Sequence, residues 1–375
     1  MSKAHSQNKT SKRTRRAKKD SILTRILTGA SIVSVLLLWA CALSVYIHPA
    51  TFKPAGVMGL GFPFLLAGVL FMQLMMLLFA FRRSWIPAVG MLLCAGTIRT
   101  YFPINFPSIA PKGCVKVMTY NVCNWGHGDS AYTEDGKHNL IAQYMAQSEA
   151  DIICVQEGTA TEGFYEKFAR PELKRTPHMD SISLSTNRLV LFSAYPIVKK
   201  QRICQKDYNG SGAFWLVMEP GDTLIVINSH LQSNHLSHEE RDGWSRMVKQ
   251  PKDNLADSVS RSLYHKIAES GVARAEMADS IANFIERHRH LSILVCGDFN
   301  DSPVSYTHQR ISQGLKDAYV RTANGIGRTF SQDAIYVRID HILCSRDWKP
   351  YQCAVDNLTF LSDHFPVTCY LKRNK

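Results

Sequence analysis

The chain has 375 residues and a formal net charge of +13, from 44 Lys and Arg against 31 Asp and Glu. Such a basic balance is typical of nucleic-acid binding, but residues 1–111 hold 13 of the bases and one acid, Asp20, so residues 112–375 hold 31 bases and 30 acids. The larger part of the chain is therefore near neutral, and its overall charge does not explain affinity for a polyanion.

The N-terminus is predicted to be a basic cytoplasmic tail, residues 1–21, in front of a membrane span. Its first 19 residues hold eight Lys/Arg and no acid, and residues 26–47 form an uncharged run of 22 residues, long enough to span a bilayer. A cleaved signal peptide would have a shorter apolar region and no further span. Lipoprotein processing at Cys41 is a weaker alternative, because Cys41 lies deep in the apolar run.

Further apolar segments extend the predicted membrane region to residues 22–106. Residues 55–81 add 27 uncharged residues, whereas residues 84–98 supply only 15 before Arg99. Interfacial and buried helices share the shorter length, but Trp85 stands where an interfacial aromatic residue would flank a span. We therefore expect three transmembrane helices, of which the third is the least clear.

Charge sets the expected orientation of these spans. The basic tail, together with Arg82 and Arg83, should face the cytoplasm, whereas the loop after the first span carries only Lys53. With three spans, the rest of the chain lies outside the cytoplasmic (inner) membrane. We expect this multi-pass arrangement; with two spans, the C-terminal domain would instead be cytoplasmic.

From residue 112 onward, short apolar runs that alternate or are continuous predict strands, and each run stops at polar residues. Strands outnumber helices, and successive strands often lack the intervening helix that a doubly wound parallel sheet requires. We therefore expect residues 112–375 to form an α/β domain, a four-layer sandwich of two mixed β-sheets flanked by helices.

Polar residues that could bind a metal or transfer a proton stand at or near the ends of those strands. Each one alone is explained by turn formation. Together they would form a pocket of carboxylates, amides and imidazoles if the strand ends meet at one edge. That inventory suits phosphoryl chemistry with a hard divalent cation, because Mg²⁺ prefers few carboxylates and keeps several waters. The residues are Asn121, Glu157, His230, Asp298, Asn300, Asp340, Asp363 and His364.

Over about residues 113–373, these motifs resemble the endonuclease/exonuclease/phosphatase superfamily, the fold of DNase I. Met118-Thr119-Tyr120-Asn121 resembles its first strand, and Val155-Gln156-Glu157 resembles its metal-binding motif. The resemblance implies Mg²⁺, or Mn²⁺ as a substitute. It makes Glu157 the principal ligand, with Asn121 and Asp363 helping at the metal site.

The catalytic roles are also implied by resemblance. His230, in Asn228-Ser229-His230-Leu231, would contact the scissile phosphate or protonate the leaving group. In Gly297-Asp298-Phe299-Asn300, Asp298 would position or deprotonate the attacking water, and Asn300 would bind a phosphate oxygen. Asp340 would orient His364, which would stabilise the pentavalent phosphate. Arg188 precedes a strand without the family's usual glycine, so it receives no role.

The expected function is a membrane-anchored, Mg²⁺-dependent phosphodiesterase or phosphatase. Its expected partners are the bilayer and a phosphoester substrate: a phospholipid derivative, an inositol phosphate or a nucleic acid. No protein partner can be inferred. A membrane-anchored or extracytoplasmic nuclease and an inactive binding module on the same fold are the alternatives. A transporter is disfavoured because the predicted spans contain no acidic residue.

Local features leave smaller expectations open. Cys344 and Cys353 could face each other across a hairpin and pair. The section 237–271 could be a lid over the substrate, a surface helix facing the membrane or a solvated helical elaboration, and its charges balance. We expect Gly271 to break the helical section that continues to residue 290.

Overall fold

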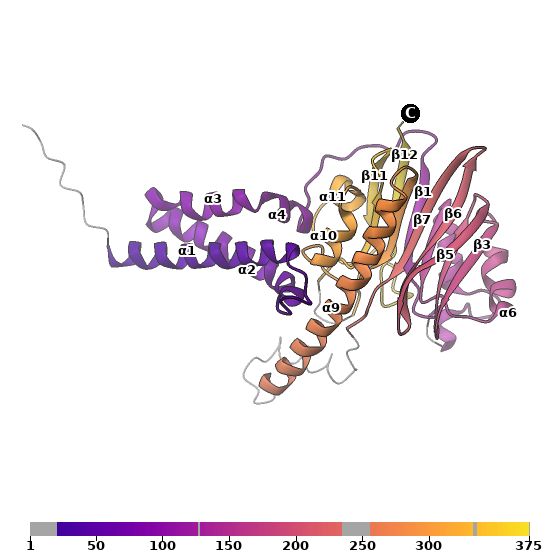
Figure 1. The fold of residues 1–375 in the computed structure, drawn as a ribbon, viewed down its shortest axis with the longest axis horizontal. Coiled ribbons are helices and arrows are strands. Elements are labelled where there is room, and N and C mark those ends of the chain that lie inside the picture. Colours follow the sequence, from indigo (N-terminus) through magenta and orange to yellow (C-terminus); the bar gives the residue numbers. More distant parts are fainter. Residues whose placement is uncertain (1–20, 127, 235–255, 333–335, 375) are drawn as a thin grey trace, which may run out of the picture.

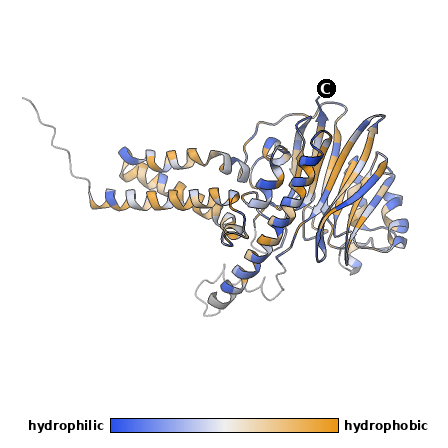
Figure 2. Ribbon diagram, in the orientation of Figure 1, coloured by the Kyte–Doolittle hydropathy of each residue, from blue (hydrophilic) through white to orange (hydrophobic). Residues whose placement is uncertain are grey.

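The computed structural model describes residues 21–126, 128–234, 256–332 and 336–374. These residues form two parts of different character, because a group of helices projects from one side of a β-sandwich (Figure 1). The projecting helices are predominantly hydrophobic along their length, whereas the sandwich mixes hydrophobic and hydrophilic residues (Figure 2).

Four helices make up the projecting part. Ser21 caps the first helix, because its hydroxyl accepts a hydrogen bond from the Thr24 amide. Helices α1 and α2 are long and apolar enough to cross a membrane. Phe64 and Leu78 on α2 are 76% and 63% exposed, which is compatible with membrane anchoring. The bounds are α1 Ile22–Leu43, α2 Ala55–Phe79, α3 Trp85–Leu93 and α4 Ala95–Tyr101, with 3₁₀ turns η1 Ser44–Tyr46 and η2 Phe81–Arg83.

The third predicted span is divided into two short helices. Helices α3 and α4 have nine and seven residues and meet at Cys94. They run back beside α1 and α2 toward the sandwich (Figure 1). Neither is long enough to cross a bilayer alone. The three-span count and the boundaries at residues 1–21, 22–106 and 112–375 therefore stay predictions.

Two mixed six-stranded sheets form the sandwich, as predicted. In each sheet one strand pair is parallel, β1 with β2 and β7 with β8, while the other pairs are antiparallel. The first sheet has the order β11-β12-β1-β2-β4-β3: Trp348–Val355, Val367–Arg373, Val115–Asn121, Ile152–Gln156, Asn187–Ser193 and His178–Leu184. The second has the order β5-β6-β7-β8-β10-β9: Ile197–Lys206, Asn209–Glu219, Asp222–His230, Ser292–Asp298, Asp340–Cys344 and Lys316–Asp317.

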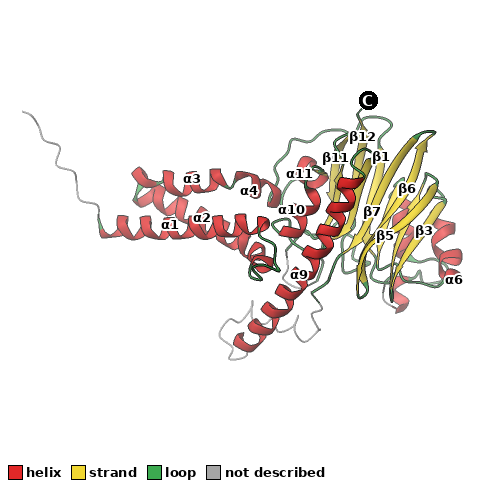
Figure 3. Cartoon of the chain, viewed as in Figure 1, coloured by secondary structure: helices red, strands yellow, loops and turns green. Residues whose placement is uncertain are grey.

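Helices cover the outer faces of both sheets, so the four-layer prediction is confirmed (Figure 3). One core lies between the sheets, where Val117 and Leu189 of the first meet Phe214 and Val226 of the second. The outer helical bounds are α5 Leu140–Gln147, α6 Glu162–Phe164, η4 Tyr165–Ala169 and α7 Arg170–Glu172 against the first sheet, and α9 Ala256–Arg287 and α10 Tyr306–Ser312 against the second. Shorter elements are η3 Gly128–Ala131 and α11 Ala318–Thr322.

The prediction that Gly271 breaks a helix is wrong, because α9 continues through it from Ala256 to Arg287. Gly271 instead allows a close helix contact: a Cβ built on it would lie 3.3 Å from the Cα of Gly56, near the start of α2. A side chain here would be in tight contact with α2, so packing favours glycine despite its low helix propensity. Residues 237–255 of the section 237–271 lie outside the described residues. Cys344 and Cys353 are both free and buried.

Candidate active site

Strand register gathers the predicted residues at one edge of the sandwich. In the second sheet β8 lies between β7 and β10, and Asp298 is paired with His230 on one side and with Asp340 on the other. In the first sheet Asn121 ends β1, and Glu157 directly follows the parallel neighbour β2. The edges of both sheets therefore contribute side chains to one site.

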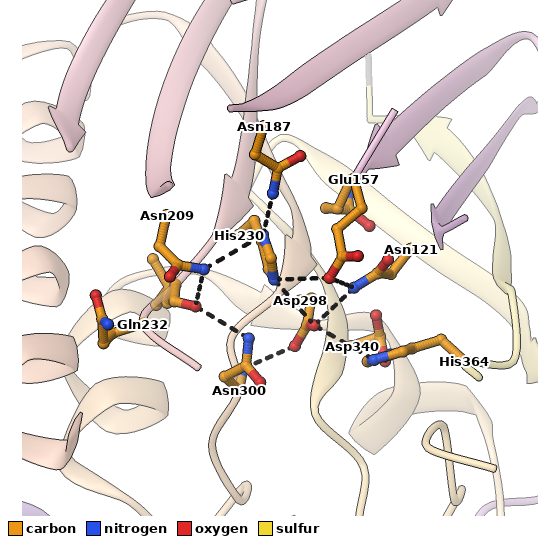
Figure 4. A network of polar contacts seen from close by, with 12 residues as sticks. Asn121, Glu157, Asn187, Asn209, His230, Gln232, Asp298, Asn300, Asp340 and His364 are labelled. Carbon is orange, nitrogen blue, oxygen red and sulfur yellow. Dashed lines mark hydrogen bonds and ion pairs between the residues drawn. The ribbon is translucent and has the colours of Figure 1, made fainter. Parts of the chain in front are cut away.

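An amide lies between two carboxylates in this pocket (Figure 4). Asn121 Nδ2 donates to Glu157 Oε1 and to Asp298 Oδ2, each at 3.1 Å. His230 Nε2 lies 3.5 Å from Glu157 Oε1 and 3.7 Å from Asp298 Oδ2. The Glu157 side chain is 27% exposed, whereas that of Asp298 is 1% exposed. Glu157 is therefore the solvent-accessible acid of this site, and Asp298 is the buried one.

A divalent cation fits these donors. Asp340 Oδ2 is 2.9 Å from His364 Nδ1, but its buried Oδ1 has no hydrogen-bond partner among the residues that the structure describes. A carboxylate oxygen of Asp298 lies within 4.8 Å of one of Asp340. Together with Glu157, these carboxylates offer the hard oxygen atoms that Mg²⁺ and Mn²⁺ bind. A bound cation would satisfy the orphaned oxygen of Asp340.

Two residues predicted to bind the metal have their oxygen atoms in other hydrogen bonds. Asn121 turns its NH₂ toward the carboxylates, while its Oδ1 accepts a hydrogen bond from the Cys123 amide at 3.1 Å. Asp363 Oδ1 accepts from the Ser362 hydroxyl at 3.3 Å, and among the described residues its carboxylate is not joined to Glu157 by a hydrogen bond. The metal-binding roles of Asn121 and Asp363 stay predictions.

The His364 imidazole is held between two acids. Its Nδ1 contacts Asp340, and its Nε2 lies 3.6 Å from Asp298 Oδ2. Burial disfavours the charged ring, but the neighbouring carboxylates of Asp340, Asp298 and Asp363 outweigh it and raise the pKa of His364 to about 10. His364 is therefore a charged donor at neutral pH.

The pKa of Asp298 is also raised, but for an acid this disfavours the charged form. Burial raises its pKa to about 6, and the Asp340 charge acts in the same direction, against His364, His230 and the Asn300 amide. The Asn300 backbone amide donates to Asp298 Oδ1 at 2.8 Å, and the Asn300 side chain donates to the Leu231 carbonyl at 3.0 Å. A carboxylate with this pKa is suited to accept a proton near neutral pH.

The backbone at the site is strained at two predicted residues. Glu157 and Asn300 both have φ of 52°, in the left-handed region that side chains other than glycine rarely adopt. Each follows the end of a strand, so the turn aims its side chain back toward the pocket. Such conformations cluster at functional sites, where the surrounding structure holds them in place.

Sequence reasoning missed two buried amides beside His230. Asn187 Nδ2 is 3.0 Å from His230 Nδ1, and Asn209 Nδ2 is 3.4 Å from the same atom. They stand at the beginnings of β4 and β6, each antiparallel to a strand that ends at the site. A sequence pattern of polar residues at strand ends does not include residues at strand beginnings.

A second amide pair lies beneath the pocket and joins the two sheets. Gln156 Nε2 donates to Asn228 Oδ1 at 2.7 Å, and Asn228 Nδ2 donates to the carbonyls of Val155 and Val190 at 3.0 Å. Both amides are fully buried. Their signal was present in the sequence, because Gln156 precedes Glu157 and Asn228 stands in the motif that ends at His230.

Two mixed sheets with an acid and imidazole pocket at their common edge define a DNase I-like hydrolase fold. The chain belongs to the endonuclease/exonuclease/phosphatase family, whose model matches residues 118–364 and so includes all eight predicted site residues. A second family model, described as a domain of unknown function, matches residues 24–101. No curated protein matches the chain in sequence.

Solved structures include distant relatives in fold. An endonuclease/exonuclease/phosphatase family protein from Bacteroides thetaiotaomicron is 18% identical, covers 70% of this chain and 98% of its own, and has a TM-score of 0.46. The human Nocturnin catalytic domain with bound sulfate is 17% identical, with coverages of 70% and 94% and a TM-score of 0.47. A Bacteroides thetaiotaomicron mannosyl-6-phosphatase is 19% identical, with coverages of 69% and 99% and a TM-score of 0.44. Any activity that these names state belongs to the named proteins.

Proposed function

We propose that this chain is a membrane-anchored, Mg²⁺-dependent hydrolase that cleaves a phosphoester, as a phosphodiesterase or a phosphatase. Membership of the endonuclease/exonuclease/phosphatase family supports a phosphoester hydrolase. The observation that carries the proposal is the buried arrangement of Asp340, His364 and Asp298, which combines a charged imidazole with an acid of raised pKa.

Glu157 and the orphaned oxygen of Asp340 would hold the cation, which when bound would lower the pKa of a water and polarise a phosphoryl oxygen. Asp298 accepts the proton of the attacking water as the new oxygen–phosphorus bond forms. His364, kept charged and oriented by Asp340, stabilises the negative oxygens of the pentavalent phosphate. The bond to the leaving oxygen then breaks, and that oxygen takes up a proton from solvent water.

Contacts between the two parts support an extracytoplasmic active site. His48, in the loop that joins α1 to α2, lies 3.4 Å from Asp279 of α9. Arg338 of the sandwich donates to the carbonyl of Thr100 in α4 at 2.8 Å. The N-terminal end of α1 points away from the sandwich (Figure 1), and the residues before α1 are basic in sequence, so the positive-inside rule favours a sandwich outside the cytoplasm. This arrangement requires the residues of α3 and α4 to cross the membrane together.

Position favours a membrane-derived phosphoester as the substrate. The anchored domain stays near a lipid surface, and residues 112–375 lack the excess of bases on which extended phosphate contacts with a nucleic acid depend. A phospholipid or another membrane-derived phosphoester is therefore preferred to DNA or RNA. Sphingomyelin and inositol phosphates represent this substrate class in an assay.

The test is a substrate panel for the full chain purified in detergent: sphingomyelin, inositol phosphates, DNA, RNA and bis-p-nitrophenyl phosphate, with Mg²⁺ or with a chelator. We expect Mg²⁺-dependent hydrolysis that Glu157→Gln weakens, while Glu166→Gln, an exposed change on η4, leaves it intact. Preference for DNA or RNA would establish the nuclease alternative. A folded chain that hydrolyses nothing would revive the inactive binding module.

A further inference from the structure

The two ring nitrogens of His230 face opposite chemistry (Figure 4). Nδ1 is approached by the amide nitrogens of Asn187, at 3.0 Å, and Asn209, at 3.4 Å. Nε2, on the other side of the ring, faces oxygens of Glu157 at 3.5 Å and Asp298 at 3.7 Å. Donors therefore surround one nitrogen and acceptors the other, although a histidine by itself can carry its proton on either.

Other contacts fix which end of each amide faces the ring. Asn187 Oδ1 accepts from the Arg188 backbone amide at 2.7 Å, so its NH₂ points to His230. The Asn209 NH₂ also donates to the Leu231 carbonyl at 3.1 Å, and a flipped amide would set two oxygens against each other. Asn187, Asn209 and His230 are all buried, so bulk water does not replace these contacts.

We propose that Asn187 and Asn209 are positioning residues that hold His230 as the neutral tautomer with its proton on Nε2. A proton on Nδ1 would point at two N–H groups, whereas a proton on Nε2 faces carboxylate oxygens of Glu157 and Asp298. His364 is the contrast, because both of its nitrogens face carboxylates. His230 then donates a fixed hydrogen bond to the phosphoester instead of delivering a proton. This catalytic meaning rests on the proposed function.

The tautomer can be measured without turnover. The full chain, labelled with ¹⁵N-histidine in detergent micelles with Mg²⁺, should show an unprotonated Nδ1 and a protonated Nε2 for His230, identified by its loss in His230→Gln. Asn187→Asp replaces a donor by an acceptor of the same size and should move a proton to Nδ1. Asn283→Asp, the same change on the exposed face of α9, should leave the ring signals unchanged.

Kinetics provide the second measurement. Asn187→Ala and Asn209→Ala should each lower kcat by about tenfold, the size of one lost hydrogen bond, with little change in KM, because the donor acts in the transition state. A protonated Nδ1 in the wild-type chain, or ring signals that do not respond to Asn187→Asp, would overturn the inference. A wild-type chain that is inactive on every substrate would instead reject the proposed function, and the tautomer would still be measurable.

Discussion

The helical part and the sandwich distribute the same kinds of side chain in opposite ways. Phe64 of α2 is 76% exposed, whereas Phe214 between the sheets is 0% exposed. The sandwich also buries ionisable groups, with Asp298 and Asp340 each 1% exposed. An apolar surface outside and charges inside are both unfavourable in water unless a lipid covers the first and partners satisfy the second.

This contrast separates two uses of burial. In the sandwich, burial raises the pKa of Asp298, whereas the carboxylates around His364 outweigh burial and raise the pKa of its ring, so both groups are suited to chemistry. In the helices, exposed apolar area is what a bilayer would cover. At the junction between the two parts, the backbones are in close contact. An added Cβ on Gly59 of α2 would be 1.7 Å from the Val304 carbonyl oxygen.

The largest effect should come from removing the buried charge of His364. His364→Gln keeps a polar side chain but leaves the Asp340 carboxylate without its ionic partner. We expect kcat to fall by about a thousandfold or more, because the charge acts on the transition state. His290→Gln, an exposed change after α9, is the matched control and should retain activity. Near-normal turnover of the folded His364→Gln chain would remove the assigned site.

A smaller change is expected in the pH dependence of kcat at saturating Mg²⁺. Asp298 must be ionised to accept a proton, so activity should rise as the pH passes about 6. His364 must stay protonated, so activity should fall as the pH passes about 10. Asp340→Asn removes a charge that raises both pKa values, so both limbs should move to lower pH. On the alkaline limb, the rate at a fixed pH should therefore fall by about tenfold.

The exposed turn residue Asp207 gives the matched control for that profile. Asp207→Asn should leave both limbs in place, because the residue lies in the turn between β5 and β6 and asparagine tolerates its φ of 51°. Limbs that stay unchanged in Asp340→Asn would show that other groups control the rate.

Much of the site follows from the sequence because strand ends are visible there. Apolar runs stop at Asn121, His230 and Asp298, and parallel neighbours end at the same edge of a sheet. The pattern cannot show register, however, and register is what pairs Asp298 with both His230 and Asp340. Convergence was therefore a prediction until the pairing of strands was known.

Two kinds of feature were beyond the sequence. Asn187 reaches the site because β4 runs antiparallel to β2, so its beginning lies beside the end of β2. Gly271 looked like a helix break because glycine has low helix propensity, but contact with Gly56 decides its role. Both depend on neighbours that are distant in the chain, which local patterns do not record.

The junction provides a test of intermediate size. Gly59→Val should push α2 away from the Val304 carbonyl and lower the free energy of unfolding by about 1–3 kcal/mol, as overpacking does. Gly68→Val on the same helix is the matched control, because nothing lies within 4 Å of its added Cβ. Thermal melting in detergent compares them. Equal stability of the two variants would show that α2 does not support the sandwich.

The smallest effect is expected on the exposed face of α2. Phe214→Ala in the core should cost about 3–5 kcal/mol, whereas Phe64→Ala should change the free energy of unfolding in detergent by less than about 1 kcal/mol, because little protein contact is lost. Denaturation of the full chain measures both. If Phe64→Ala destabilised the chain as strongly as Phe214→Ala, protein would cover this face, and α2 would be a contact surface between copies of the chain, not a surface for lipid.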